Sequence, residues 1–96
     1  MAKHFNITGA LTQELLASGD RVKASSIWLT NIHATDAVVV DLYIEKKLTG
    51  KFYFLKNYSI ARHLFLKDIN FSNNPGGFGL YIKLNAADSA VDIIIN

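Results

Sequence analysis

The stretch Val38-Val39-Val40-Asp41-Leu42-Tyr43-Ile44-Glu45 decides the fold class of this chain. Every second residue from Val38 to Ile44 is a branched aliphatic, and these residues alternate with Val39, Asp41, Tyr43 and Glu45. Successive side chains of a β-strand point to opposite faces, so this period of two predicts a strand with one buried and one wet face. Strands of this kind are typical of antiparallel sheets that cover a core.

The same alternation recurs later in the chain, over residues 78–84 and 91–95. Other runs of branched and aromatic residues predict strands over residues 5–7, 22–32, 52–55 and 60–66. Within residues 22–32, the pattern places Ile27 and Leu29 on one face and Trp28 on the other. Turn-forming clusters separate these runs at residues 18–20, 31–36, 49–50, 68–70 and 72–77. We therefore predict an all-β chain, a jelly-roll-like antiparallel β-sandwich of about seven or eight strands.

One segment, Leu11-Thr12-Gln13-Glu14-Leu15-Leu16-Ala17, fits two structures. Gly19 follows it, so two helical turns with a glycine stop are compatible with the sequence. The strands expected on both sides favour a strand instead. The sequence leaves this choice open.

Composition limits the chain to one domain, residues 1–96, with a core of its own. Its 96 residues are 50% hydrophobic and only 19% charged, which excludes intrinsic disorder of the whole chain. The chain has no cysteine, so disulfides, thiolate catalysis, zinc fingers and iron–sulfur clusters are excluded. The longest hydrophobic runs, such as residues 37–40 and 93–95, are too short to span a bilayer, and we expect no membrane association and no signal peptide.

No combination of residues predicts a catalytic, cofactor or metal site. The three histidines, His4, His33 and His63, are about 30 residues apart and have no carboxylate or second histidine at ligand spacing. The acidic residues form no pair suited to general acid and base, and no glycine-flanked serine resembles a nucleophile. Gly76-Gly77-Phe78-Gly79 precedes a predicted strand, whereas a phosphate-binding loop precedes a helix. We therefore expect no enzyme activity.

Basic residues gather in the middle of the chain. Six of the ten lysines and arginines lie between Glu45 and Asp68, with no acidic residue among them: Lys46, Lys47, Lys51, Lys56, Arg62 and Lys67. The same segment carries Phe52, Tyr53, Phe54, Tyr58 and Phe65. Lysines interleaved with aromatics are typical of small β-barrels that bind single-stranded DNA or RNA, which makes residues 51–67 a candidate for that function. The alternatives are core aromatics with lysines that protect an edge strand, or a basic surface that docks onto an acidic protein.

The order of segments also resembles a known group of proteins. A turn at residues 18–20 leads into a branched strand that ends at Asn31, a polar loop over residues 32–37 and a valine-rich strand over residues 38–44. An aromatic run over residues 52–55, the Ile60-Ala61 step and a closing strand over residues 90–95 follow. This order, from about Leu15 to the end, resembles small β-sandwich virion structural proteins of tailed bacteriophages.

The resemblance implies a non-enzymatic virion component, first a capsid decoration (cement) subunit that stabilises the particle and, as an alternative, a neck or tail accessory subunit. It implies a homo-oligomer located in a virion assembled in the host cytoplasm, with partners such as the major capsid protein or connector and tail subunits, and no cofactor. Large residues on strand faces opposite the core, and the lysines, are the expected contacts. The predicted contact residues are Phe5, Ile7, Trp28, Tyr43, Lys46, Lys47, Lys51, Tyr53 and Tyr81. Residues 1–16 are a candidate N-terminal arm that adds a strand to a neighbouring sheet.

Overall fold

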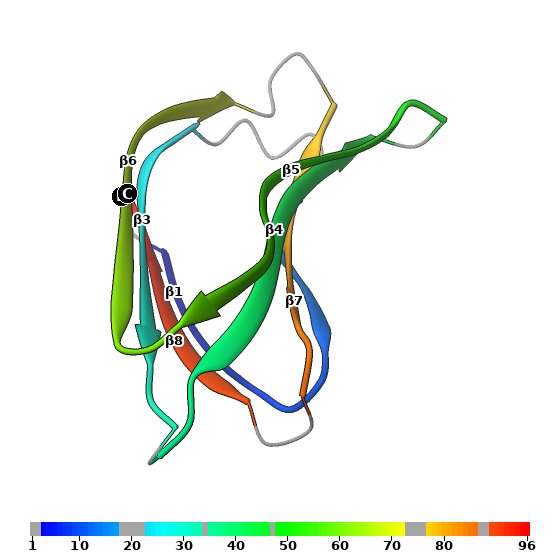
Figure 1. Cartoon of the computed structure of the whole chain (residues 1–96). Coiled ribbons are helices and arrows are strands. Elements are labelled where there is room, and N and C mark those ends of the chain that lie inside the picture. Colours follow the sequence, from blue (N-terminus) through cyan, green and yellow to red (C-terminus); the bar gives the residue numbers. More distant parts are fainter. Residues whose placement is uncertain (1–2, 18–22, 34, 47, 73–76, 87–88) are drawn as a thin grey trace.

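A computed structural model of the chain describes residues 3–17, 23–33, 35–46, 48–72, 77–86 and 89–96 (Figure 1). Eight strands and no helix occur within these residues. They are β1 (Lys3–Thr8), β2 (Thr12–Leu16), β3 (Lys23–Asn31), β4 (Val38–Lys46), β5 (Gly50–Ile60), β6 (His63–Ser72), β7 (Gly79–Leu84) and β8 (Ala90–Ile95). The described part of the chain therefore has no helix long and apolar enough to cross a membrane.

The strands form two four-stranded antiparallel sheets, ordered β1-β8-β3-β6 and β2-β7-β4-β5. Pairing runs from the ends of the chain inward: β1 pairs with β8, β2 with β7, β3 with β6 and β4 with β5. The chain is thus one long antiparallel ribbon, closed at the β4–β5 turn and folded over so that β3 also pairs with β8 and β4 with β7. This is the strand order of a jelly roll, which confirms the predicted fold class.

The core lies between the two sheets and is built from alternate residues of their strands. Leu42 of β4 and Ile82 of β7 meet Ile27 and Leu29 of β3 and Ile93 of β8, and all of them are buried. Burying each such side chain contributes about 1.5 to 3 kcal/mol. Branched side chains at alternate positions of β4, β7 and β8 face inward. The alternation in the sequence therefore identifies the residues on the inner faces of the two sheets.

Residues 3–16 belong to the sandwich itself, which corrects the hypothesis of an N-terminal arm. β1 pairs with β8 in one sheet and β2 with β7 in the other. Ile7, Leu15 and Leu16 are buried in the common core, so this segment supplies core side chains that a neighbouring subunit could not take without opening the sandwich. The segment over residues 11–17 forms the strand β2, which settles the choice that the sequence left open.

The largest differences from the predicted boundaries occur in β5 and β6. Ile60 ends β5 instead of beginning the next strand. The turn predicted at residues 68–70 lies inside β6, where the register with β3 shifts and Asp68 has a positive φ of 59°. Its turn-forming residues therefore produce a bulge instead of a reversal. The turn predicted at residues 18–20, and positions 73–76 of the turn predicted at residues 72–77, lie outside the described residues.

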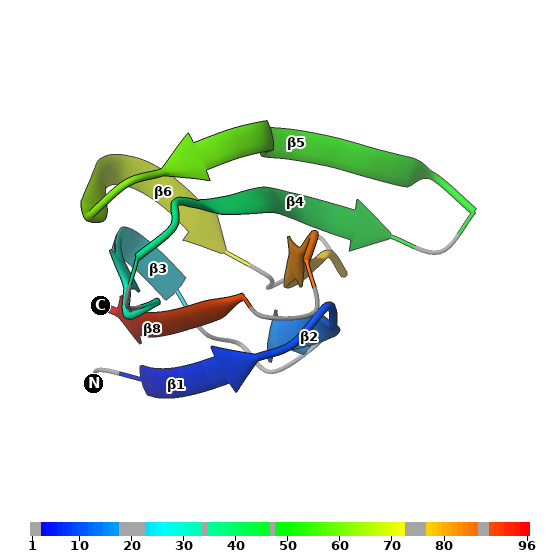
Figure 2. The same cartoon turned by 60° about the horizontal axis from the view of Figure 1, so that its bottom comes forward.

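The β4–β5 hairpin extends away from the rest of the sandwich (Figure 2). The predicted turn at residues 49–50 closes it: Leu48 and Gly50 have positive φ, and the Thr49 amide donates to the Lys46 carbonyl at 3.0 Å. The molecule measures 41 × 28 × 18 Å. Figure 2 also shows β5 and β6 along one side of the sandwich and β1 and β2 along the other.

Candidate interaction surfaces

The groups most often used in catalysis and metal binding are scattered. Among the described residues, no three His, Asp or Glu side chains are close enough to hold a metal ion. His4 lies on β1, His63 begins β6, and His33 lies between β3 and β4. There its Nδ1 accepts hydrogen bonds from the backbone amides of Thr35 and Asp36, at 3.2 and 3.0 Å. His33 therefore organises its own loop. The exposed surfaces of the sandwich are therefore the places to look for a binding function.

A row of tyrosines crosses the outer face of the β2-β7-β4-β5 sheet. Tyr81 of β7 stands opposite Tyr43 of β4, which stands opposite Tyr53 of β5. The ring centroids are 5.6 Å apart for Tyr81 and Tyr43, and 5.2 Å apart for Tyr43 and Tyr53. The Tyr81 hydroxyl donates to Glu14 Oε2 of β2 at 3.1 Å, so the row joins all four strands. A Cβ at Gly79 would lie 2.9 Å from Tyr81 Cε1, so only glycine leaves room for this ring position.

Lysines of β5 cover this row. Lys51 Nζ lies 5.1 Å from the centre of the Tyr43 ring, and Lys56 Nζ lies 4.7 Å from that of Tyr53. Lys56 also pairs at 3.5 Å with Asp41, a buried carboxylate that accepts the Asn57 amide at 2.7 Å. These lysines therefore have partners within the chain, and cation–π contacts of this kind stabilise it modestly.

Burial under this cover raises the pKa of Tyr43, although the positive charge of Lys51 partly opposes the shift. Tyr43 does point away from the core, as the alternation predicts, but only 4% of it is exposed. Its prediction as a contact residue is therefore wrong, because its neighbours on β5 and β7 already cover it. Tyr81 is half-buried in the same row, and burial followed by its hydrogen bond to Glu14 raises its pKa.

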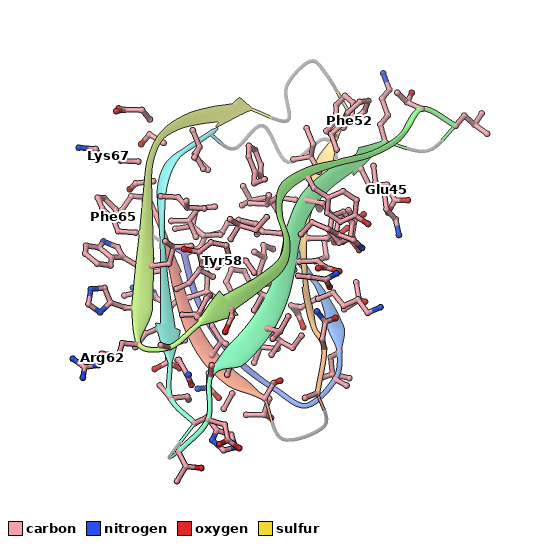
Figure 3. All side chains as sticks on the ribbon, in the orientation of Figure 1. Glu45, Phe52, Tyr58, Arg62, Phe65 and Lys67 are labelled. Atoms are coloured by element: carbon pink, nitrogen blue, oxygen red, sulfur yellow. The ribbon has the colours of Figure 1, made fainter. Side chains whose placement is uncertain are left out.

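The opposite situation holds on β5, where large apolar side chains are uncovered. Phe52, Phe54 and Tyr58 are 53%, 39% and 43% exposed, and we call them the β5 surface. Phe52 stands opposite Ile44 and Tyr58 opposite Val40, so both lie on the inner face of their sheet. Figure 3 shows Tyr58 directed into the space between the two sheets on their β5–β6 side. The second sheet does not cover these rings, and they remain in contact with water.

A second uncovered group lies on the outer face of the β1-β8-β3-β6 sheet. Trp28 of β3, Phe65 of β6 and Ile94 of β8 are each about two-fifths exposed, and we call them the Trp28 platform. The Trp28 and Phe65 rings stack, with centroids 4.1 Å apart and planes 20° apart. Phe65 projects away from the sandwich in Figure 3.

The other predicted contact residues differ in how exposed they are. Trp28, Lys46, Lys51 and Tyr53 are exposed, and Lys47 lies outside the described residues. Ile7 is buried in the core, so the expectation that it lies at a surface is wrong, whereas Phe5 is half-buried and packs against the core. Both occupy inward positions of β1, one of the strands that close the sandwich.

The predicted protein contacts left out Phe52, Phe54, Tyr58, Phe65 and Ile94, which are exposed, although the first four stand in the segment predicted as an alternative nucleic-acid surface. The parity of Ile94, between the inward Ile93 and Ile95, was a signal that could have found it. Phe65, between Leu64 and Leu66, gives the same signal. The residues of β5 give none, because two register shifts against β4 break the parity.

Comparison with known proteins assigns no family to the chain. No protein-family model matches it, and no curated protein matches it. It is similar to the crystal structure of the Yersinia pseudotuberculosis-derived mitogen, with 13% sequence identity, a TM-score of 0.48, and coverage of 99% of this chain and 81% of that one.

Proposed function

We propose that this chain is a non-enzymatic structural subunit of a bacteriophage virion, a capsid decoration protein that binds a neighbouring virion protein through the β5 surface. The exposure of Phe52, Phe54 and Tyr58 on an edge strand carries this proposal. Edge strands of isolated domains are normally protected from association, whereas exposed aromatics are enriched at the centres of protein interfaces.

The surroundings of the β5 surface suit such a contact. Lys46 lies at the hairpin end of β4, beside β5, and is exposed, so it supplies a positive charge at the border of this surface for an acidic partner. Many copies on a symmetric particle bind with avidity, and each copy then needs only a modest interface. The resemblance to phage virion proteins supports a particle as the setting. A neck or tail accessory subunit is the alternative, and it would use the same surface on a different partner.

The proposal predicts that purified virions of the source phage contain the chain in many copies, which mass spectrometry of the particles measures. Purified chain should also rebind particles that lack it. Replacing Phe52 and Tyr58 together by Ser should weaken rebinding about 1,000-fold, because buried aromatic contacts at interfaces each contribute about 2 kcal/mol or more and every 1.4 kcal/mol is about tenfold in affinity. Leu11→Ser is the matched control, since Leu11 is as exposed as Phe52 but lies outside β5.

Two results would contradict the proposal: absence of the chain from the virions, or rebinding that the double variant leaves unchanged. Sedimentation of the isolated chain tests the expected homo-oligomer separately.

Binding of single-stranded nucleic acid is the second candidate, because Lys51 and Lys56 share β5 with its three exposed aromatics. The cation–π contacts of both lysines inside the chain make them less available to phosphates. Gel-shift titration with single strands at low and high salt separates the two functions. A steep loss of affinity with salt favours nucleic acid, and no shift at low salt favours the structural subunit.

A further inference from the structure

The Trp28 platform continues into a polar row that the proposed function does not use. On the outer face of the β1-β8-β3-β6 sheet, Trp28 stands opposite Phe65 on one side and Ile94 on the other. These three side chains form an apolar band across neighbouring strands. Because Trp28 and Phe65 stack at 4.1 Å, one face of the indole ring is held against Phe65, while about two-fifths of Trp28 stays exposed to a ligand.

The next row on the same face is hydrophilic. Thr30 stands opposite His63 on one side and Asp92 on the other, and Asp92 stands opposite Asn6. Asn6 Nδ2 donates to Asp92 Oδ1 at 2.5 Å, which fixes both side chains. Residues two apart on one strand are separated by about 6.8 Å. The polar row and the platform are therefore close enough for one small ring-shaped ligand to contact both.

A shallow depression adjoins the platform at Ile94. His4, Phe5, Asn6, Asp92, Ile93 and Ile94 line it. The depression and the platform share Ile94, and the depression and the polar row share Asn6 and Asp92. The exposed Trp28 platform, the polar row beside it and the depression at its end thus form one continuous surface.

We infer that this face binds a neutral oligosaccharide, with one sugar ring on Trp28 and the next unit in the depression. A pyranose ring has an apolar face of C–H groups, which are attracted to the electron-rich face of an aromatic ring, and a periphery of hydroxyls. Those hydroxyls both donate and accept, which matches a row containing a carboxylate, an amide, a hydroxyl and an imidazole. Ligand sites in general combine an apolar surface with a few placed polar groups in this way.

The charges at the platform favour a neutral ligand. Asp92 lies on one side of the Trp28 row, and Lys67, paired with Ser26, lies on the other. Figure 3 shows Lys67 beside Phe65 on the outer side of β6. Among the described residues, the face thus carries a negative charge at one border and a positive charge at the other, and a neutral ligand is repelled by neither.

Fluorescence of the chain provides a direct test, because Trp28 is its single tryptophan. The probes are cellohexaose, maltohexaose and chitohexaose, three neutral chains that differ in linkage and substituents. We expect at least one of them to change the tryptophan emission in a saturable manner. Phe65→Ala should weaken this binding about 10-fold through loss of ring stacking. Phe52→Ala is the matched control, since it removes an exposed phenylalanine from the other surface and should leave sugar binding unchanged.

Asp92→Asn provides a second variant that keeps the shape of the site. Hydrogen bonds to an ionised group are about twice as strong as neutral ones, so this change should weaken sugar binding while leaving the thermal midpoint of the chain nearly unchanged. The inference is overturned if none of the three sugars alters the emission, or if the response persists in Phe65→Ala. It is also overturned if Phe65→Ala instead dissociates an oligomer of the chain, because the platform is then a contact between copies.

Discussion

Asn31 ties two loops to the same end of the sandwich, and replacing it should destabilise the fold measurably. Its Nδ2 donates to the carbonyl oxygens of Asp36 at 2.8 Å, Ile60 at 2.9 Å and Ala61 at 3.2 Å. Its Oδ1 accepts the His33 amide at 2.7 Å. One side chain thus connects the segment after β3 with the passage from β5 to β6, where the chain crosses between sheets.

The size of the effect follows from these bonds. The Asn31 Nδ2 has two hydrogens for three carbonyl acceptors, so two of the acceptors share one hydrogen. Two bonds donated by Nδ2 and one accepted by Oδ1 give about three full hydrogen bonds. Each contributes about 0.5 to 1.5 kcal/mol net, and water reaches the site partly, so Asn31→Ala should lower the free energy of unfolding by about 2 kcal/mol. For a domain of this size, that loss corresponds to a fall of about 8 to 16 °C in the midpoint of thermal unfolding.

Circular dichroism during thermal unfolding measures this fall. Asn31→Asp sharpens the test, because aspartate keeps an acceptor for the His33 amide but places a carboxylate against three carbonyl oxygens. The order of stability should be wild type, then Asn31→Ala, then Asn31→Asp. Asn6→Ala is the control, since it removes one exposed hydrogen bond between β1 and β8 and should change the midpoint only slightly. A wild-type midpoint in Asn31→Ala, or an Asn31→Asp variant more stable than Asn31→Ala, would refute this reasoning.

Three further predictions concern the tyrosine row and its cover. Gly79→Ala should lower the free energy of unfolding by about 1 to 3 kcal/mol in urea titration, and much less in a chain that already carries Tyr81→Ala, because the new methyl meets the Tyr81 ring. Raised pKa values of Tyr43 and Tyr81 mean that their contribution to stability is constant below pH 10.0 and declines above it, as the unfolded chain loses protons that the folded chain keeps. Titration of tyrosinate absorbance in folded and urea-unfolded chain should show late ionisation only in the folded state, and identical curves would contradict the assignment. Asp41→Ala should lower the unfolding free energy by about 1.5 to 3 kcal/mol through its lost hydrogen bond, whereas Lys56→Met should change it little.

The sequence predicts the fold well where one face of a strand is wet and the other is dry. In β4, β7 and β8 a branched aliphatic residue stands at every second position, and the structure places these residues on the inner faces. In β5, by contrast, residues 52–55 are all apolar, and the register shifts beside Leu42 turn neighbouring residues to unexpected faces. Its length and end therefore did not follow from periodicity.

The exposed surfaces were less predictable, because whether an outward side chain is buried depends on which strands lie next to its own. The parity of Tyr43 correctly places it away from the core, but only the order β7-β4-β5 brings Tyr81, Tyr53 and Lys51 around it. Trp28 remains exposed because its neighbours, Phe65 and Ile94, lie beside it instead of above it. The same parity argument therefore succeeds for Trp28 and fails for Tyr43, and the difference comes from topology.

The proposal that this chain attaches to a virion through β5 is tested most directly by a cryo-electron microscopy reconstruction of the proposed phage particle at a resolution that separates strands. We expect density for this jelly roll at repeated positions, with Phe52 and Tyr58 buried against a neighbouring virion protein. A reconstruction that contains the chain with its β5 strand facing solvent, or that lacks the chain altogether, would contradict it.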